Sequence, residues 1–161
     1  MPYLLDADVF ITAKRSHYRT AVCPGFWDWV IRAHGAGVVF SVREVREELL
    51  AGRDALASWA AALPPGFFLQ PDTRVAAVLP TVSNWPQTRP YAAQAVADFF
   101  DAADYWLVAH ALAGGHVVVT HEVPDPACKR RVKIPDVCAG LGVNWMSPFD
   151  MLEAEAARFV L

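Results

Sequence analysis

The sequence lacks any apolar segment that approaches the roughly 20 residues needed to cross a bilayer. Its N-terminus also lacks a basic region followed by the apolar stretch of a secretory signal peptide. Positive charge is not in excess, because the formal net charge is −3, which excludes a protein that coats nucleic acid indiscriminately. A local basic patch remains compatible with this charge. We therefore expect a cytoplasmic protein without a membrane partner.

Cysteine is scarce and its spacing indicates no cross-link or zinc site. The three cysteines, Cys23, Cys128 and Cys138, form no Cys-x-x-Cys pair and no Cys and His pattern of the zinc-binding kind. A disulfide framework would also need an even number of cysteines. We expect all three to be small, buried and free.

Hydrophobic residues make up 55% of the 161 residues, enough for a sizeable core in one domain spanning residues 1–161. Strand-like and helix-like segments alternate along the chain. This alternation predicts an α/β fold of three layers, with helices on both faces of a central, mainly parallel sheet of about five strands. Strands are expected before Asp6 and at 38–40, 67–69, 116–122 and 143–146. Helices are expected around 26–31, from Ser41, at 55–63, 73–79 and 91–113, from Pro135, and after Ser147.

Two of the expected strands end in an acid. A short apolar run leads to Asp6, and the run from His116 leads to Glu122. Ligands of open parallel sheets bind at the carboxyl ends of the strands, and a buried charge is costly unless it is paired or binds a metal. Asp6 and Glu122 are therefore candidate site residues. The alternative is that Asp6 and Asp8 begin a turn or cap the next helix.

Helical spacing sorts the acids on two helices. Ser41 and Glu44 form a capping-box pattern, whereas Glu47 points to solvent and Glu48 lies beside the apolar stripe. Glu48 is therefore the functional candidate among the glutamates. In the expected helix 91–113, Asp104 shares a face with apolar residues and is the second helical candidate.

Basic residues follow the second acidic strand. The cluster is Lys129, Arg130, Arg131 and Lys133, and a second basic segment begins with Lys14 and Arg15. Such runs are most often solvated loops, and a loop is the favoured interpretation of the segment around Lys14. If the neighbouring acids form a nuclease site, both segments are candidate RNA-binding residues.

Four carboxylates, those of Asp6, Glu48, Asp104 and Glu122, are expected to converge above the strand ends. Carboxylates that converge repel one another unless they hold protons or bind a hard cation, usually Mg²⁺ or Mn²⁺. Such ions activate water and orient a phosphodiester, which is the chemistry of a nuclease. Possible additional acids of the site are Asp8, Asp101 and Asp136, although Asp136 also suits the first turn of a helix.

The chain resembles PIN-domain proteins of the VapC-type ribonuclease toxin kind. The segments that carry the resemblance are Leu4–Val9, Val45–Leu49, Asp104–Ala111 and Val118–Glu122. Two further segments, Cys23–Trp29 and Lys133–Cys138, resemble a PIN-like subfamily of largely uncharacterised proteins. The resemblance implies a three-layer α/β/α fold, metal-dependent cleavage of RNA, frequent homodimers and an antitoxin partner. Asp8 and Glu122 depart from the usual asparagine and aspartate, which implies an altered metal geometry.

Two other functions are compatible with the sequence. Leu5–Val9 also resembles the opening motif of haloacid-dehalogenase-type phosphatases, but none of the lysines stands where that chemistry needs one, and the strand before Glu122 offers a single acid. The second alternative is a catalytically weak PIN-like interaction module, because the fold alone does not imply activity.

Overall fold

The computed structural model describes residues 1–161 and is built around a five-stranded sheet in which all neighbouring strands are parallel. The strand order is β3-β2-β1-β4-β5. The first half of the chain adds β2 and β3 on one side of the central strand β1, and the second half adds β4 and β5 on the other side. The crevice above such a switch point is where open α/β sheets bind ligands. The strands are β1 (Tyr3–Leu5), β2 (Val39–Val42), β3 (Phe68–Leu69), β4 (Val117–Val119) and β5 (Trp145–Met146).

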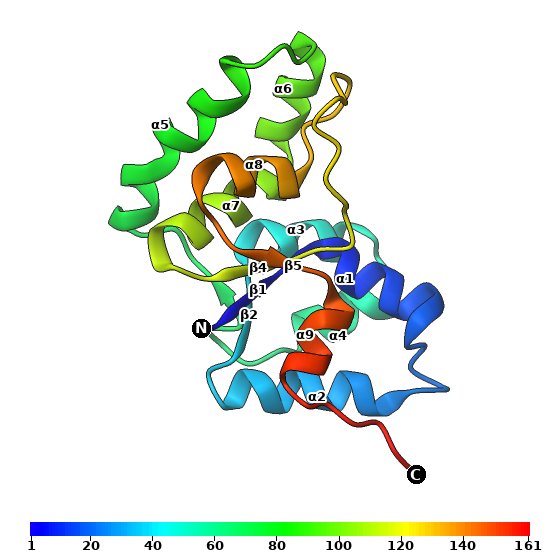
Figure 1. Ribbon diagram of the computed structural model, residues 1–161. Helices are drawn as coiled ribbons and strands as arrows, with labels where there is room; N and C mark the ends of the chain where they lie inside the picture. The colour runs from blue at the N-terminus through cyan, green and yellow to red at the C-terminus, as the bar shows by residue number, and fades with distance from the viewer.

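Helices cover both faces of the sheet, which confirms the predicted three-layer α/β/α architecture. In Figure 1, α2 and α9 lie on one side of the strands, and α3 and α7 lie on the other. Helices α5, α6 and α8 all contact α7. The helices are α1 (Ala7–Thr12), the π-helix η1 (Ala13–His17), α2 (Pro24–Gly35), α3 (Arg43–Ala51), α4 (Ala55–Ala61), α5 (Thr73–Gln87), α6 (Ala93–Asp101), α7 (Ala103–Gly114), α8 (Ile134–Leu141) and α9 (Pro148–Ala154). None of them has the length and apolar character needed to cross a membrane.

The central strands are short and apolar because both of their faces are covered. Leu4, Leu5, Val118 and Val119 are completely inaccessible to solvent. A strand with two buried faces does not alternate between apolar and polar residues. This explains why the strands are visible in the sequence as continuous apolar runs.

The helix expected at 91–113 is two helices, α6 and α7, and that expectation was wrong. Ala102 separates them, with extended backbone angles of φ −87° and ψ 161°. Apolar periodicity continues on both sides of the break, so the sequence pattern does not reveal it. The break places Asp104 in the first turn of α7 instead of the middle of a long helix.

Helix α5 is longer than expected, because it continues from Thr73 to Gln87 through Pro80 and Pro86. Each proline removes one backbone donor and favours a helix end. Here packing outweighs that cost, because Val82 and Pro86 are buried and α5 contacts both α7 and α8. The irregular connector expected after Leu79 was therefore wrong.

The capping box expected at Ser41 and Glu44 does not form. Ser41 lies within β2, fully buried, and its hydroxyl donates a hydrogen bond to the carbonyl oxygen of Leu5 at 2.6 Å. Val42 occupies the cap position of α3 without a side-chain bond. Glu44 is buried and forms an ion pair with Arg43 at 3.0 Å. Sheet formation thus outweighs the local capping preference of Ser41.

Candidate active site

A cavity of about 300 Å³ lies at the carboxyl ends of β1 and β4, the switch point of the sheet. We call it the acid pocket. Its charged lining residues are Asp6, Asp8, Glu48, Asp104, Glu122 and Arg131. All four acids singled out in the sequence therefore line one pocket, and Asp8 joins them. Five carboxylates face a single guanidinium group, which leaves the pocket with an excess of negative charge.

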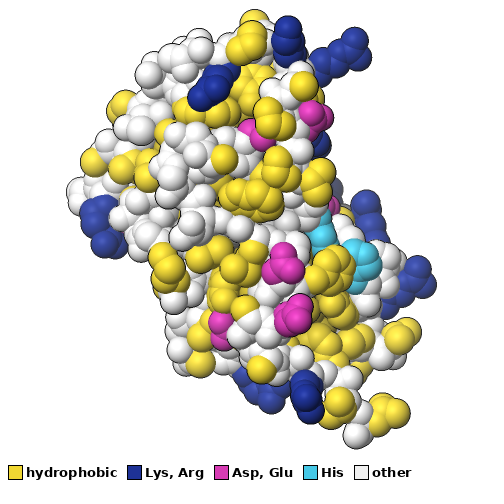
Figure 2. Space-filling model, viewed as in Figure 1, with side chains coloured by type: hydrophobic (Ala, Val, Ile, Leu, Met, Phe, Trp, Pro, Cys, Tyr) yellow, Lys and Arg dark blue, Asp and Glu magenta, His cyan; other side chains and the backbone are white.

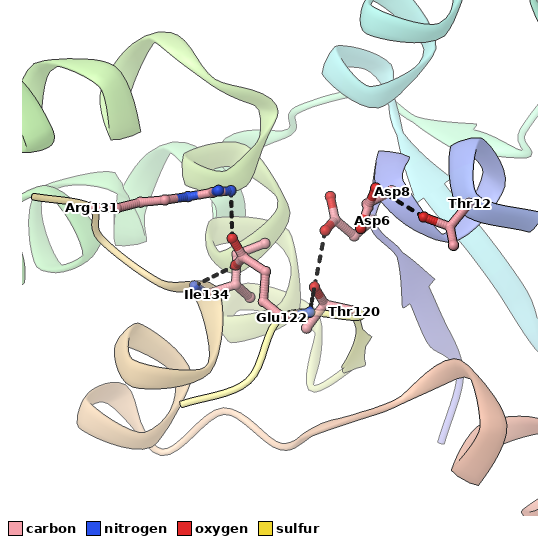
Figure 3. Close-up of polar contacts among 7 residues, drawn as sticks. All are labelled: Asp6, Asp8, Thr12, Thr120, Glu122, Arg131 and Ile134. Atoms are coloured by element: carbon pink, nitrogen blue, oxygen red, sulfur yellow. Dashed lines mark hydrogen bonds and ion pairs between the residues drawn. The ribbon is translucent and has the colours of Figure 1, made fainter. Parts of the chain in front are cut away.

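Asp6 enters the pocket directly from β1. Its backbone amide donates to the carbonyl oxygen of Val119 at 3.0 Å, which continues the pairing of β1 with β4. One side-chain oxygen accepts a hydrogen bond from the Thr120 hydroxyl at 3.0 Å (Figure 3). Asp6 occupies the cap position of α1 and Asp8 lies in its first turn, as the alternative expected, but the Asp6 side chain makes no capping bond. Burial raises the pKa of Asp6 well above its usual range, and the neighbouring charge of Asp104 raises it further.

Asp104 faces the same pocket from the first turn of α7. Burial and then the charges of Glu122 and Glu48 raise its pKa to about 7, although Arg131 acts in the opposite direction. Asp6 and Asp104 are therefore two carboxyl groups that resist ionising together. A hard cation placed between the acids would remove this repulsion.

The two glutamates of the pocket are held by backbone amides. Glu48 accepts a hydrogen bond from the amide of Ala103 at 3.1 Å, so it caps α7 from a neighbouring helix. Glu122 accepts from Arg131 at 2.6 Å and from the amide of Ile134 at 2.9 Å (Figure 3). Strand β4 ends at Val119, so Glu122 lies in the following loop and not at the strand end, where we expected it.

As the side chains stand, no three His, Cys, Asp or Glu residues are close enough together to hold a metal ion. The hydrogen bonds of Glu48 and Glu122 contribute to this separation of the potential ligands, because they hold both carboxylates against backbone amides. The chemistry of the donor set nevertheless fits Mg²⁺ or Mn²⁺, which prefer carboxylate oxygens. The raised pKa values of Asp6 and Asp104 likewise indicate a pocket that is short of positive charge.

The remaining predicted acids lie elsewhere or at the rim. Asp8 lines the pocket but is exposed, and it accepts a hydrogen bond from the Thr12 hydroxyl at 3.1 Å. Asp101 is exposed at the end of α6 and does not line the pocket. Asp136 lines a different cavity, and it accepts from the amide of Asp125 at 3.1 Å. The structure therefore does not bring Asp101 or Asp136 to the acid pocket.

The basic residues divide between several surfaces. Arg131 lines the acid pocket, and together with Arg130 it lines an adjoining cavity of about 260 Å³ that Asp104 also borders. Lys129 borders the cavity that contains Asp136, and Lys133 occupies the cap position of α8. The general expectation that such basic residues lie in a solvated loop therefore does not hold for Arg131, which is paired with Glu122.

Lys14 and Arg15 lie in the π-helix η1, so the loop expected there was wrong. Both border a cavity that Glu48 also lines, beside the acid pocket. Lys14 forms an ion pair with Asp54 at 3.6 Å. This pairing leaves Arg15 as the more exposed cation of the segment.

Sequence reasoning missed two residues next to the acids. The Thr120 hydroxyl donates to Asp6 and accepts from the amide of Glu122 at 3.1 Å, so it connects two of the carboxylate-bearing residues. His121 lines the pocket, and its ring lies 5.3 Å from that of His17. Burial lowers the pKa of His121, which favours a neutral imidazole. In the sequence, the one sign that Thr120 and His121 belong to the site is their position between an apolar strand and Glu122.

Comparison with known proteins shows the fold and the family. A chain of the structure of VapBC-1 from nontypeable Haemophilus influenzae is similar to this one, with a TM-score of 0.53 and 15% identity, over 91% of this chain and 98% of that chain. At that identity the likeness concerns the fold. A comparison with curated proteins finds no match. The model of a family described as a domain of unknown function, DUF4411, matches residues 3–159, and the chain therefore belongs to the DUF4411 family.

Proposed function

We propose that this protein is a metal-dependent endoribonuclease of the PIN-domain kind and the toxin of a toxin–antitoxin pair. The observation that carries the proposal is the acid pocket, in which Asp6, Glu48, Asp104 and Glu122 meet at the switch point of a parallel sheet. The fold likeness to a VapBC-1 chain and the sequence resemblance to VapC-type toxins support it.

Asp6 and Asp104 would hold Mg²⁺ or Mn²⁺, and Glu48 and Glu122 border the same space. A bound ion of this kind lowers the pKa of water and offsets charge on a phosphodiester. Thr120 fixes the orientation of the Asp6 carboxylate through its hydrogen bond. Arg131, with a side chain that is 61% exposed, can reach a phosphate at the mouth of the pocket while its ion pair keeps Glu122 in place.

A cleavage assay tests the proposal. The purified protein is incubated with labelled single-stranded RNA in Mn²⁺, in Mg²⁺ and in a chelator. We expect endonucleolytic products with at least one of the two metals and none in the chelator, because cleavage needs a cation among the acids. Equal cleavage in the chelator would contradict the metal-dependent mechanism.

One observation favours a second candidate, a catalytically weak interaction module. No three potential ligands are close enough together to hold an ion as they stand. RNA binding without cleavage in either metal would support this candidate. An antitoxin partner and a homodimeric assembly belong to the toxin proposal and follow from the resemblance to VapC-type toxins. A cytoplasmic location is part of the same proposal.

Removing Arg130 and Arg131 should weaken RNA binding and reduce its dependence on salt. Each lost phosphate contact lowers the slope of log affinity against log salt by about 0.7 for a single strand. The measurement is a titration of labelled RNA against wild type and an Arg130→Ala/Arg131→Ala variant at several salt concentrations, with Ca²⁺ in place of Mg²⁺. Arg32→Ala is the control, because Arg32 is exposed on α2, across the sheet from this loop. A slope equal to that of wild type would remove the two arginines from the RNA-binding surface.

A further inference from the structure

A second cavity, of about 540 Å³, lies between the end of α5, the turn that follows it, the 126–129 loop and α8. We call it the aromatic cavity. It is separate from the acid pocket and shares none of its lining residues. Its main side chains are Trp85, Arg89, Tyr91, Cys128, Lys129 and Asp136.

Two aromatic rings and a guanidinium group form one side of this cavity. The ring centroids of Trp85 and Tyr91 are 6.0 Å apart, and the Arg89 guanidinium lies 4.6 Å from the Trp85 ring centroid. The Trp85 ring packs directly against Gly140, where a Cβ atom would stand 2.0 Å from its Nε1. Any larger residue at 140 would displace the ring. The backbone of α8 therefore fixes this aromatic surface in position.

A carboxylate faces the same space. Asp136 is only 9% exposed, and its one hydrogen bond to the protein engages a single oxygen, which accepts from the amide of Asp125 at 3.1 Å. The other oxygen is left without a protein partner. This oxygen is not among the fully buried atoms that lack a partner, so it is accessible to water and to a ligand that supplies a donor.

Three consecutive basic residues connect the aromatic cavity with the acid pocket. Lys129 borders the aromatic cavity, Arg130 and Arg131 border the intervening cavity, and Arg131 also borders the acid pocket. The amide of Ala92 donates to the carbonyl oxygen of Lys129 at 2.9 Å, which ties the loop to the start of α6. Figure 2 shows basic side chains at the upper end of the molecule, where α6 and this loop lie in Figure 1.

We propose that the aromatic cavity binds one nucleobase of a single-stranded RNA whose backbone follows Lys129, Arg130 and Arg131 to the acid pocket. The base contacts the aromatic surface of Trp85 and Tyr91, and aromatic side chains of this kind bind bases of any sequence. Asp136 adds selectivity, because a carboxylate accepts hydrogen bonds from base amino and imino groups. Guanine presents two such donors side by side and fits best, whereas the uracil edge is mostly acceptors.

This inference rests on the proposed function, because it assumes that RNA is the ligand of the acid pocket. It adds a base preference at a site remote from the cleaved bond. The phosphate contacts of the basic residues carry no such preference.

Cys128 provides a direct test in the wild-type protein. Iodoacetamide is allowed to alkylate the protein in a chelator, with and without an oligouridine that carries a single guanosine, and each cysteine is quantified by peptide mass spectrometry. When the RNA is present at about ten times its dissociation constant, alkylation of Cys128 should slow about tenfold. Cys23 is the internal control, because it is partly exposed at the start of α2 on the other side of the sheet.

A binding titration in Ca²⁺ tests the role of Asp136. Replacing one uridine by guanosine should tighten binding to wild type about tenfold, which is within the range of a good bidentate base contact. Inosine should fall between the two, because it lacks the amino group. Asp136→Asn should abolish the difference. Asp150→Asn should retain it, because Asp150 is an exposed acid in the first turn of α9 and matches Asp136 in helix position.

The outcomes separate this inference from the proposed function. If RNA is bound and cleaved while Cys128 reacts at an unchanged rate, the aromatic cavity is not a base site and the nuclease proposal stands. Retention of the guanosine preference in Asp136→Asn, with a melting temperature like that of wild type, would also overturn the inference. If Cys128 is protected but no metal supports cleavage, the base site stands and the nuclease proposal fails.

Discussion

Asp104→Asn should abolish metal-dependent RNA cleavage and at the same time make the protein more stable at neutral pH. Asp104 is a predicted metal ligand, and replacing residues that merely support such ligands already costs about 10- to 100-fold in metal affinity or activity. We therefore expect the cleavage rate to fall by more than about 100-fold. The gain in stability follows because the substitution removes one member of a repelling carboxylate group.

Asp6→Asn should give the same loss of cleavage, since Asp6 is the most deeply buried acid of the pocket, at 6% exposure. The matched control is Glu47→Gln on α3. The Glu47 side chain is 65% exposed, and its ion pair with Arg43 at 3.8 Å is a surface contact. Glu47→Gln should cleave RNA within a few-fold of wild type.

Cleavage rates and thermal unfolding of the metal-free proteins check these expectations together. Inactivity of Glu47→Gln would show that Glu48 is the wrong choice on α3. Glu48→Gln and Glu122→Gln complete the set. If metal-free wild type melts at a higher temperature than Asp6→Asn, Glu48→Gln, Asp104→Asn and Glu122→Gln, the acids serve the fold and not a metal site.

The stability of the metal-free protein should fall as pH rises from about 4 to about 7. The pKa of Asp104 is raised from 3.8 to about 7 in the folded state, so in this interval the folded protein binds more protons than the unfolded chain. The contribution is complete below the unfolded pKa and is lost as pH rises through the folded pKa. Asp6 acts in the same direction, because its pKa is also raised.

His110 opposes this trend in acid. Burial lowers its pKa to about 4, so its effect is to destabilise the fold as pH falls from about 6.5 towards 4. The informative quantity is therefore the melting temperature of Asp104→Asn minus that of wild type, measured from pH 5 to pH 8. This difference should grow with pH by several degrees, at about 2–4 °C for each kcal/mol in a chain of this size.

Mn²⁺ should offset the loss of stability that the metal-free protein shows as pH rises. Added at pH 8, it should raise the melting temperature of wild type, because a cation among the acids stabilises the folded state that binds it. The rise should be absent or much smaller in Asp104→Asn. If the difference in melting temperature between Asp104→Asn and wild type does not change with pH, the pKa of Asp104 is not raised on folding. An equal rise with Mn²⁺ in both would show that the ion binds elsewhere.

The fold class and the principal acids could be predicted from the sequence because both depend on local pattern. Apolar runs separated by helical segments indicate a covered parallel sheet, and an acid after such a run indicates the carboxyl end of a strand. Asp6 was identified in this way, whereas Asp104 was identified from the apolar face that it shares in a helical segment. Helical spacing also distinguished Glu48 from Glu47: both residues are exposed, but only Glu48 lines the acid pocket.

Tertiary contacts decided what local pattern could not. The capping preference of Ser41 is outweighed because its hydroxyl bonds to Leu5 in the neighbouring strand. Packing against α7 and α8 allows α5 to continue through Pro80. The break at Ala102 leaves the amide of Ala103 without a partner within the helix, and this amide donates a hydrogen bond to Glu48 of α3.

The partners of the acids were likewise set by residues distant in the chain. Glu122 is paired with Arg131, whereas Asp136 is directed to the aromatic cavity, although both acids lie near the same basic run. Sequence pattern reports which face of a helix or strand a residue occupies. Which cavity that face borders depends on how the helices pack over the sheet, and only the folded chain determines this.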